Sequence, residues 1–303
     1  MGRFQASMGE NAGVDLLTTI QIIHGYFPPQ TTRFPSFPWS PAQDVLTPWQ
    51  MPSEAPVALF CSDLDGTLLG RPEATAQFRT TWESLGDDRP LLVYSTGRLI
   101  QDAMRMIRQS GLPEPDYYIG GVGTVIHRTH DESTMGAFSE VLDQGWDRDR
   151  VQRVLEQFDE IEEQAPEQQH AWKSSWFWHK ASEADLDRLS HALKDAGLEA
   201  QIVYSSARDL DVLPVSANKG NALRWLCAHH GIPVEQAIVA GDTGNDSSMF
   251  LVPGVRGIMP VNAEAELRQA LADASAYAAS GECTDGIIEG LQHYRVFPAQ
   301  LPS

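Results

Sequence analysis

The sequence predicts an α/β fold, in which a Rossmann-like core with a parallel sheet carries an inserted α+β cap domain. From Val57 onward, short apolar runs alternate with helix-like stretches, which is typical of βα repeats that form a parallel sheet covered by helices. Four polar clusters follow the ends of strand-like runs or open helix-like stretches, and ligands of open α/β sheets bind at such an edge. Between about residues 124 and 207 the pattern changes to two strand-and-helix pairs, as expected of a separate small domain.

Length, charge and cysteine content narrow the class of protein. A chain of 303 residues is long enough for two domains with cores of their own. Its 41 acidic side chains against 22 basic ones give a formal charge of -19, which repels phosphate backbones and anionic lipid, so we expect no nucleic acid and no membrane partner. Three widely spaced cysteines without a CxxC pair indicate neither a disulfide framework nor a zinc site, and favour a cytoplasmic location.

Residues 1–55 differ from the rest, because they are rich in proline and show no sustained periodicity. We expect a weakly ordered N-terminal extension. One interpretation is a flexible extension from an early start codon, since Met51 lies just before the first strand-like run. The other is an arm that docks on a partner through aromatic side chains, namely Phe27, Phe34, Phe37, Trp39 and Trp49.

The core is predicted in two parts, 56–123 and 208–297. In the first part, strand-like runs at 56–63, 90–97 and 116–127 are separated by helix-like stretches at 73–86 and 98–111, the latter ending at Gly111 as a C-terminal cap glycine. In the second part, strand-like runs are expected at 237–242 and 255–259. The helix-like stretches of this part are 218–231, 245–252, 263–274 and 285–294.

The cap is predicted over 124–207, with amphipathic helices at 150–164 and 183–197 and strands near 172–180 and 200–206. As a strand, 172–180 places tryptophans on one face and Lys173 and Ser175 on the other. We expect the aromatic face to pack on the cap helices and the polar face, opposite Asp209 and Asp211, to meet a ligand with sugar hydroxyls. A solvated salt-bridge face is the alternative.

The four polar clusters carry the chemistry. They are Asp63 and Asp65 in DLDGT, Thr96 in STGR, Lys219 in NKGNA, and Asp242, Asn245 and Asp246 in GDTGND. A turn or a helix cap explains any one aspartate. The coincidence of D-x-D-G-T with GDxGND, however, is rarer than about one in a million random chains of this length.

This ordered set resembles the haloacid dehalogenase superfamily, in its members with the larger α/β cap, over about residues 57–296. The resemblance implies a hydrolase core in which Asp63 is the nucleophile that forms an aspartyl-phosphate. Asp65 would protonate the leaving oxygen and then activate water. Since the dehalogenases lack the second aspartate, Asp65 favours a phosphatase.

The resemblance also implies Mg²⁺ as the cofactor, held by Asp63, Asp242 and the carbonyl of Asp65, with Asp246 close by or bound through water. Thr96 and the neighbouring N–H groups would open a helix and bind phosphate, and Lys219 would supply positive charge. Gly97, Asn218 and Asn245 are assigned to substrate binding. Arg98 either contacts phosphate or pairs with a structural carboxylate, which we favour.

The substrate prediction comes from segments such as WKSSW, YSSARDLDVLP and NKGNALRWL, which resemble the sucrose-phosphate phosphatase group. A small-molecule sugar phosphate is implied, with Lys173, Ser175, Asp209 and Asp211 on the hexosyl ring. Within the group, STGRLI and VAGDTGND are most similar to the branch that acts on mannosylfructose 6-phosphate, and Val125 stands where sucrose-phosphate phosphatases have an acidic residue.

Three alternatives stay open at this point. They are a sucrose-6-phosphate phosphatase, a sugar phosphomutase on the same scaffold, and a non-catalytic module that binds the sugar phosphate or its synthase. The resemblance also allows an association with the glycosyltransferase that makes the substrate.

Overall fold

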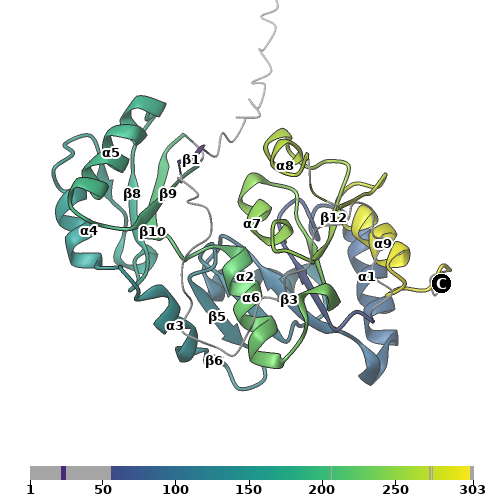
Figure 1. Ribbon diagram of the computed structural model, residues 1–303. Coiled ribbons are helices and arrows are strands. Elements are labelled where there is room, and N and C mark those ends of the chain that lie inside the picture. The colour runs from purple at the N-terminus through teal and green to yellow at the C-terminus, as the bar shows by residue number, and fades with distance from the viewer. Residues whose placement is uncertain (1–21, 25–55, 206, 273, 275, 301–303) are drawn as a thin grey trace, which may run out of the picture.

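The computed structural model describes residues 22–24, 56–205, 207–272, 274 and 276–300, arranged as two lobes (Figure 1). The larger lobe contains an eight-stranded sheet. Its strands, in spatial order, are β13 (Ala276–Ala278), β12 (Arg256–Met259), β11 (Ala237–Ala240), β2 (Leu59–Ser62), β3 (Leu91–Ser95), β4 (Tyr117–Gly120), β5 (Val125–Arg128) and β6 (Ser133–Thr134). Neighbours are parallel from β13 to β4, whereas β5 and β6 are added antiparallel. The predicted parallel α/β core is confirmed.

Helices cover both faces of this sheet, and the central strands are therefore buried on both sides. Along β2, Leu59 and Cys61 point into one hydrophobic cluster and Phe60 into the other, as the two-residue period of a strand requires. The first cluster includes residues of α3 (Gly136–Leu142), α6 (Lys219–His230), α7 (Ser247–Phe250) and α8 (Ala265–Ala270). The second includes residues of α1 (Pro72–Ser84), α2 (Ile100–Ser110) and α9 (Cys283–His293).

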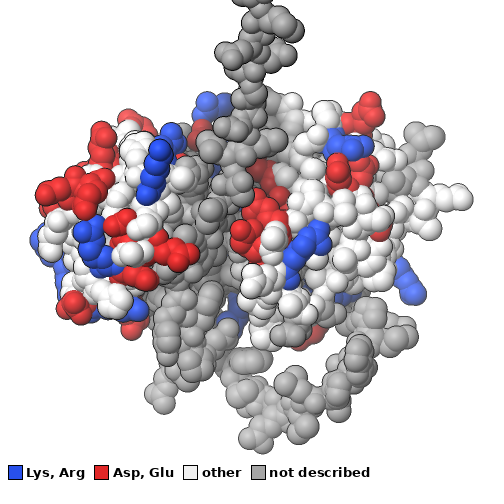
Figure 2. All heavy atoms as spheres, turned by 90° about the horizontal axis from the view of Figure 1, so that it is seen from above, with Lys and Arg blue, Asp and Glu red and all other residues white. Residues whose placement is uncertain are grey.

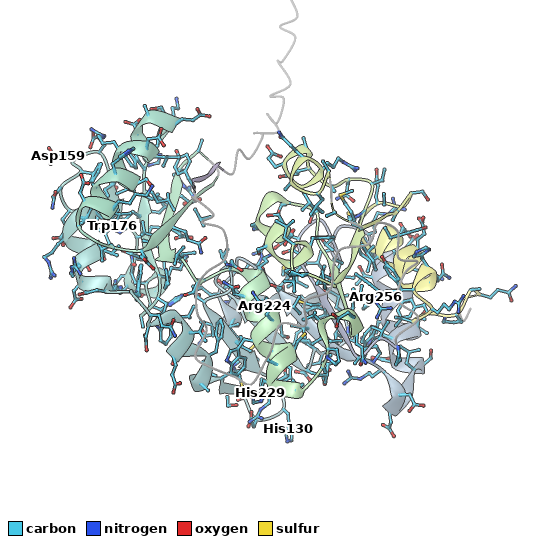
Figure 3. All side chains as sticks on the ribbon, in the orientation of Figure 1. His130, Asp159, Trp176, Arg224, His229 and Arg256 are labelled. Carbon is cyan, nitrogen blue, oxygen red and sulfur yellow. The ribbon has the colours of Figure 1, made fainter. Side chains whose placement is uncertain are left out.

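The smaller lobe, which we call the cap, is built on a five-stranded antiparallel sheet. Its order is β1 (Ile22–His24), β9 (Ala200–Ser205), β10 (Asp209–Pro214), β8 (Ser174–Phe177) and β7 (Glu162–Glu163). The helices α4 (Arg148–Leu155) and α5 (Glu183–Asp195) pack on one face, where Trp176, Leu210 and Val212 are buried against them; Figure 3 shows Trp176 inside this lobe. The predicted packing of the aromatic face is confirmed for Trp176 and Trp178, whereas Trp172 precedes β8 and packs against the core cluster.

The predicted limits of the cap, 124 and 207, do not match the membership of the strands. The turn at 121–124 contains three residues with positive φ and folds the chain back, so β5 and β6 pair onto the core sheet. At the other limit, β10 forms a hairpin with β9 and belongs to the cap sheet as far as Pro214. The prediction missed both because local patterns show where a strand lies but not which sheet it joins.

Several predicted helices are shorter in the structure. The helix expected at 150–164 ends at Leu155, since tight turns bring Phe158 onto Trp178. The helix expected at 263–274 covers only Ala265–Ala270. Short 3₁₀ turns account for further loop positions, at Gly86–Asp88, Pro166–Gln168, Val234–Gln236 and Gly244–Asp246.

Part of the N-terminal extension differs from the prediction. Residues Ile22–His24 form β1, which pairs antiparallel with Ile202–Tyr204 at the edge of the cap sheet. The expectation of weak order is therefore wrong for these three residues, because an exposed strand edge offers backbone groups for pairing. The proposed docking aromatics and Met51 lie outside the described residues.

Charged side chains of both signs lie on the surface of the protein. On the face seen in Figure 2, Asp and Glu lie on both lobes, and Lys and Arg are scattered among them on each lobe. In the described part of the chain, none of the helices combines the length and the apolar character that crossing a bilayer needs.

Candidate active site

The parallel sheet brings the predicted catalytic aspartates to one edge. Asp63 directly follows β2, and its N–H donates to the carbonyl of Ala240 at 2.9 Å. Asp242 follows β11, which pairs in parallel with β2 so that Ser62 lies opposite Ala240. Since neighbouring parallel strands end together, the two carboxylates meet although they are far apart in the sequence.

Lys219 holds two of the carboxylates from the side of α6. It is the first residue of the helix, and its fully buried Nζ lies 2.6 Å from Asp63 Oδ1 and 2.6 Å from Asp246 Oδ1. Burial alone would lower the pKa of Lys219, but the negative charges of Asp246 and Asp63 raise it above the usual value. The lysine is therefore a fixed positive charge at the predicted catalytic centre.

The single positive charge of Lys219 does not balance the negative charges of Asp63, Asp242 and Asp246. Burial raises the pKa of Asp63 well above its usual value even though Lys219 opposes the shift. Burial likewise raises the pKa of Asp242 to about 7, despite a hydrogen bond of 2.6 Å from Thr67 Oγ1. Buried acids with raised pKa values indicate a site with room for further positive charge.

The donor set fits a hard divalent cation. Ligand oxygens of Asp63, Asp242 and Asp246 lie within 4.8 Å of one another, and all three residues are buried. Asp246 already accepts from Lys219 through Oδ1 and from the N–H groups of Asp242 and Thr243 through Oδ2, so it suits a position beside the ion. Asp63 and Asp242 are the better direct ligands, in keeping with the predicted roles.

Gly66 makes room for this arrangement. Its φ of +80° is unfavourable for other residues, and a Cβ placed there would lie 2.2 Å from Asp242 Oδ2. The turn that joins Asp65 to the rest of the motif therefore requires glycine.

We expect Mg²⁺ to stabilise the folded protein. A cation that binds these carboxylates only in the native state should raise the free energy of unfolding by about 2.7 kcal/mol at a concentration 100 times its Kd. The measurement is thermal unfolding with EDTA and with increasing Mg²⁺. Asp242→Asn should lose most of the rise in Tm, whereas Asp131→Asn, which removes a carboxylate from the loop at 128–133, should keep it. An equal rise in both variants would contradict a site at Asp242.

Thr96 follows β3 at the same edge and is buried. Its hydroxyl accepts from the N–H of Arg98 at 3.1 Å. Helix α2 begins only at Ile100, so the prediction that Thr96 opens the helix is wrong. Gly97 and Arg98 form a bend, and Leu99 has an extended backbone just before the helix begins.

Asp65 does not lie in the carboxylate cluster but pairs with Arg98. The contact is bidentate, with Nε to Oδ2 at 2.7 Å and Nη2 to Oδ1 at 2.9 Å, and both side chains are about half exposed. The partner of Arg98 is therefore the predicted acid/base and not a structural carboxylate. An exposed pair contributes only about 0–1 kcal/mol, so Asp65 can leave it at little cost.

Two asparagines assigned to substrate binding have structural contacts. Asn218 is the N-cap of α6, and its Oδ1 accepts from the N–H of Asn221 at 2.8 Å. Asn245 Oδ1 accepts from Thr243 Oγ1 at 2.7 Å, within the turn that carries Asp246. Any contact of these residues with a substrate stays a prediction.

The open face of the cap sheet contains a cavity of about 400 Å³. Lys173 Nζ lies 3.1 Å from Asp211 Oδ1, and Ser175 Oγ donates to the same oxygen at 2.7 Å. The predicted polar face thus comes together as one surface. The cavity is lined by Gln164, Gln168, Lys173, Phe177, Arg208, Asp209 and Asp211.

Four of these lining residues were not among the site residues predicted from the sequence, namely Gln164, Gln168, Phe177 and Arg208. Arg208 pairs with Asp209, and its guanidinium lies 5.2 Å from the ring centroid of Phe177. Gln164 donates to the carbonyl of Trp176 at 2.9 Å and so lies beside β8. The signal for Gln164 and Gln168 was a glutamine-rich stretch, EEQAPEQQ, next to the predicted strand.

Comparisons with known proteins agree with the motifs. The family model described as sucrose-6F-phosphate phosphohydrolase matches residues 56–295. Mannosylfructose-phosphate phosphatase of Agrobacterium fabrum is 42% identical over 245 residues, which is 80% of this chain and 99% of the relative. Sucrose-phosphatase 2 of Nicotiana tabacum is 31% identical over 257 residues, which is 80% of this chain but 60% of the relative.

Solved structures show the same architecture. The X-ray structure of the sucrose-phosphatase from Synechocystis sp. PCC6803, in complex with sucrose and phosphate, matches with a TM-score of 0.70 and 33% identity. That match covers 81% of this chain and 100% of the other. A haloalkanoate-superfamily phosphatase from Bacteroides thetaiotaomicron matches with a TM-score of 0.62 at 16% identity, which shows the fold alone.

Proposed function

Because the chain belongs to the sucrose-6F-phosphate phosphohydrolase family within the haloacid dehalogenase superfamily, we propose that it removes phosphate from a disaccharide phosphate. The family makes it a phosphoric monoester hydrolase that acts on a small sugar phosphate. The finer proposal is that the substrate is mannosylfructose 6-phosphate and that the products are mannosylfructose and inorganic phosphate.

The choice of disaccharide rests on similarity and on the cap. The relative named for mannosylfructose phosphate is 42% identical over nearly its whole length, against 31% for the tobacco sucrose-phosphatase. The cap cavity carries both donors and acceptors, in Lys173, Ser175 and the two aspartates Asp209 and Asp211, as recognition of sugar hydroxyls requires. Val125 stands where sucrose-phosphate phosphatases have an acidic residue, which is a further argument for the mannosyl compound.

The proposed mechanism has two steps. In the first, Asp63 attacks phosphorus to form an aspartyl-phosphate while Asp65 donates a proton to the departing sugar oxygen. In the second, the Asp65 carboxylate takes a proton from the water that attacks phosphorus, and Asp63 is released. When bound, Mg²⁺ supplies the positive charge that lets carboxylates and phosphate share the site.

The observation that carries this proposal is the convergence of Asp63, Asp242, Asp246 and Lys219 at the end of the parallel sheet. Asp65 lies outside this group in the structure, so it must leave Arg98 before it can reach the leaving oxygen. A carboxylate whose two oxygens both accept from one guanidinium is poorly placed to carry a proton.

Phosphate release from three substrates tests the proposal. We expect kcat/KM for mannosylfructose 6-phosphate to exceed that for sucrose 6-phosphate, and fructose 6-phosphate, which lacks the second ring, to be the poorest. Loss of the second hexosyl ring should lower kcat as well as raise KM, because remote binding energy is used at the reacting centre. The control is the same assay with EDTA in place of Mg²⁺.

Other results would change the assignment. Equal or sucrose-favouring rates would support the sucrose-phosphatase alternative, which the structural match to the Synechocystis enzyme favours. Turnover that needs a bisphosphorylated sugar and releases almost no phosphate would indicate a phosphomutase, and binding without turnover would indicate a non-catalytic module. A cytoplasmic location and an association with the glycosyltransferase stay predictions.

A further inference from the structure

A histidine of the cap contacts the core beside the active site. His170 lies just before β8, in a turn closed by backbone hydrogen bonds between His170 and Lys173 at 3.1 and 3.3 Å. Its Nε2 is 3.2 Å from the hydroxyl of Thr124, which is buried in the turn between β4 and β5. His170 has no place in the proposed mechanism, yet it joins the two lobes.

The surrounding hydrogen bonds indicate which ring nitrogen of His170 carries the proton. Nδ1 accepts from the N–H of Trp172 at 3.3 Å. The Thr124 hydroxyl donates its single proton to the carbonyl of Gly121 at 2.9 Å, so Nε2 must carry the proton and donate to Thr124. Burial, with Lys173 and Arg148 nearby, lowers the pKa of His170 to about 4, so the ring is neutral near pH 7.

On the core side, the turn that accepts this bond is fixed against the predicted phosphate site. The N–H of Val122 donates to the carbonyl of Thr96 at 3.3 Å. Gly123 packs against the peptide between Asn218 and Lys219, so closely that a Cβ there would lie 2.3 Å from the Asn218 carbonyl carbon. These contacts therefore tie the position of Thr124 to the positions of Thr96 and Lys219.

On the other side, the turn at 170–173 ends at Lys173, which lines the cap cavity where we propose that the sugar binds. Trp146, which packs against the cap cluster, donates its indole N–H to the carbonyl of Ala171 at 2.7 Å. Trp172 donates its own to Asp143 at the end of α3 at 2.7 Å, which is a second tie of the turn to the core. Lys173, the last residue of the turn, is 6% exposed and reaches Asp211 in the cavity. A displacement of the turn would therefore displace Lys173.

We propose that His170 is a positioning residue, whose hydrogen bond to Thr124 sets the distance between the sugar cavity of the cap and the phosphate site of the core. The inference rests on the proposed function, since it requires a substrate that spans both sites. It predicts that the bond matters for a disaccharide phosphate and not for a phosphate ester too small to reach the cap.

The test compares His170→Leu and Thr124→Val with wild type on mannosylfructose 6-phosphate and on p-nitrophenyl phosphate. Each variant should lower kcat/KM for the disaccharide about 10- to 100-fold, because a misplacement of about 1 Å can cost 10²-fold. The rate with p-nitrophenyl phosphate should stay within about twofold of wild type. His170→Gln, whose amide can donate from near the Nε2 position, should recover most of the loss.

A double variant sharpens the result. If the two side chains act through one bond, His170→Leu with Thr124→Val should be no worse than either single variant. Equal losses on both phosphate esters, fully additive losses, or an unchanged disaccharide rate would each overturn the inference. Failure of the proposed function is recognised separately, as wild-type protein that does not prefer a disaccharide phosphate to fructose 6-phosphate, and the inference then falls with it.

Discussion

Asp63→Asn is expected to lower kcat for the disaccharide phosphate by on the order of 10⁴- to 10⁶-fold, as for the removal of other enzyme nucleophiles. The change keeps the shape of the side chain but removes the attacking oxygen anion. It also leaves one hydrogen-bond acceptor for Lys219, whose other partner, Asp246, is unchanged. The measurement is phosphate release at saturating substrate and Mg²⁺, with the fold followed by circular dichroism.

The matched control for this variant is Asp131→Asn. Asp131 also pairs with a basic side chain, that of Arg128, but at an exposed loop away from the catalytic edge. The control should keep wild-type kcat. A folded Asp63→Asn protein that retains more than about one hundredth of wild-type turnover would sink the assignment of the nucleophile.

Lys219→Met is expected to affect both activity and stability. Loss of a fixed positive charge next to developing charge should lower kcat about 10²- to 10³-fold. Because Asp63 and Asp246 would stay buried without their cation, the free energy of unfolding should fall by about 3–5 kcal/mol. Urea unfolding with EDTA measures this, and added Mg²⁺ should restore part of the loss.

The control for charge and length is Lys194→Met, at an exposed position in the last turn of α5. Surface substitutions of this kind change stability by about 0.5 kcal/mol or less. If Lys219→Met unfolded at the same urea concentration as Lys194→Met, the buried lysine would not be the counter-charge of the aspartates.

Much of the fold could be predicted because its signals are local. The alternation of buried strands and amphipathic helices predicts the parallel sheet, and the end of each strand predicts the edge where Asp63 and Asp242 meet. The alternating pattern around β8 also predicted which face carries Lys173 and Ser175. These inferences need only the period of a strand and the direction of a parallel sheet.

What could not be predicted depends on contacts between distant residues. The strand β5 joins the core sheet through a turn with Val122 in a left-handed conformation, which the sequence VGTV does not indicate. The pairing of Arg98 with Asp65 joins two segments at the same edge. Likewise, no periodicity could show that His170 reaches Thr124 across the boundary between cap and core.

The measurement that tests the account most directly is the mass of the peptide that contains Asp63 after rapid acid quench of a single turnover. Wild-type protein would be mixed with mannosylfructose 6-phosphate and Mg²⁺ and quenched before the sugar is fully released. The account predicts one phosphoryl group on Asp63 that forms as fast as the sugar appears and decays as phosphate is released. Sugar release with no phosphorylated peptide at any time, or a phosphoryl group on another residue, would contradict it.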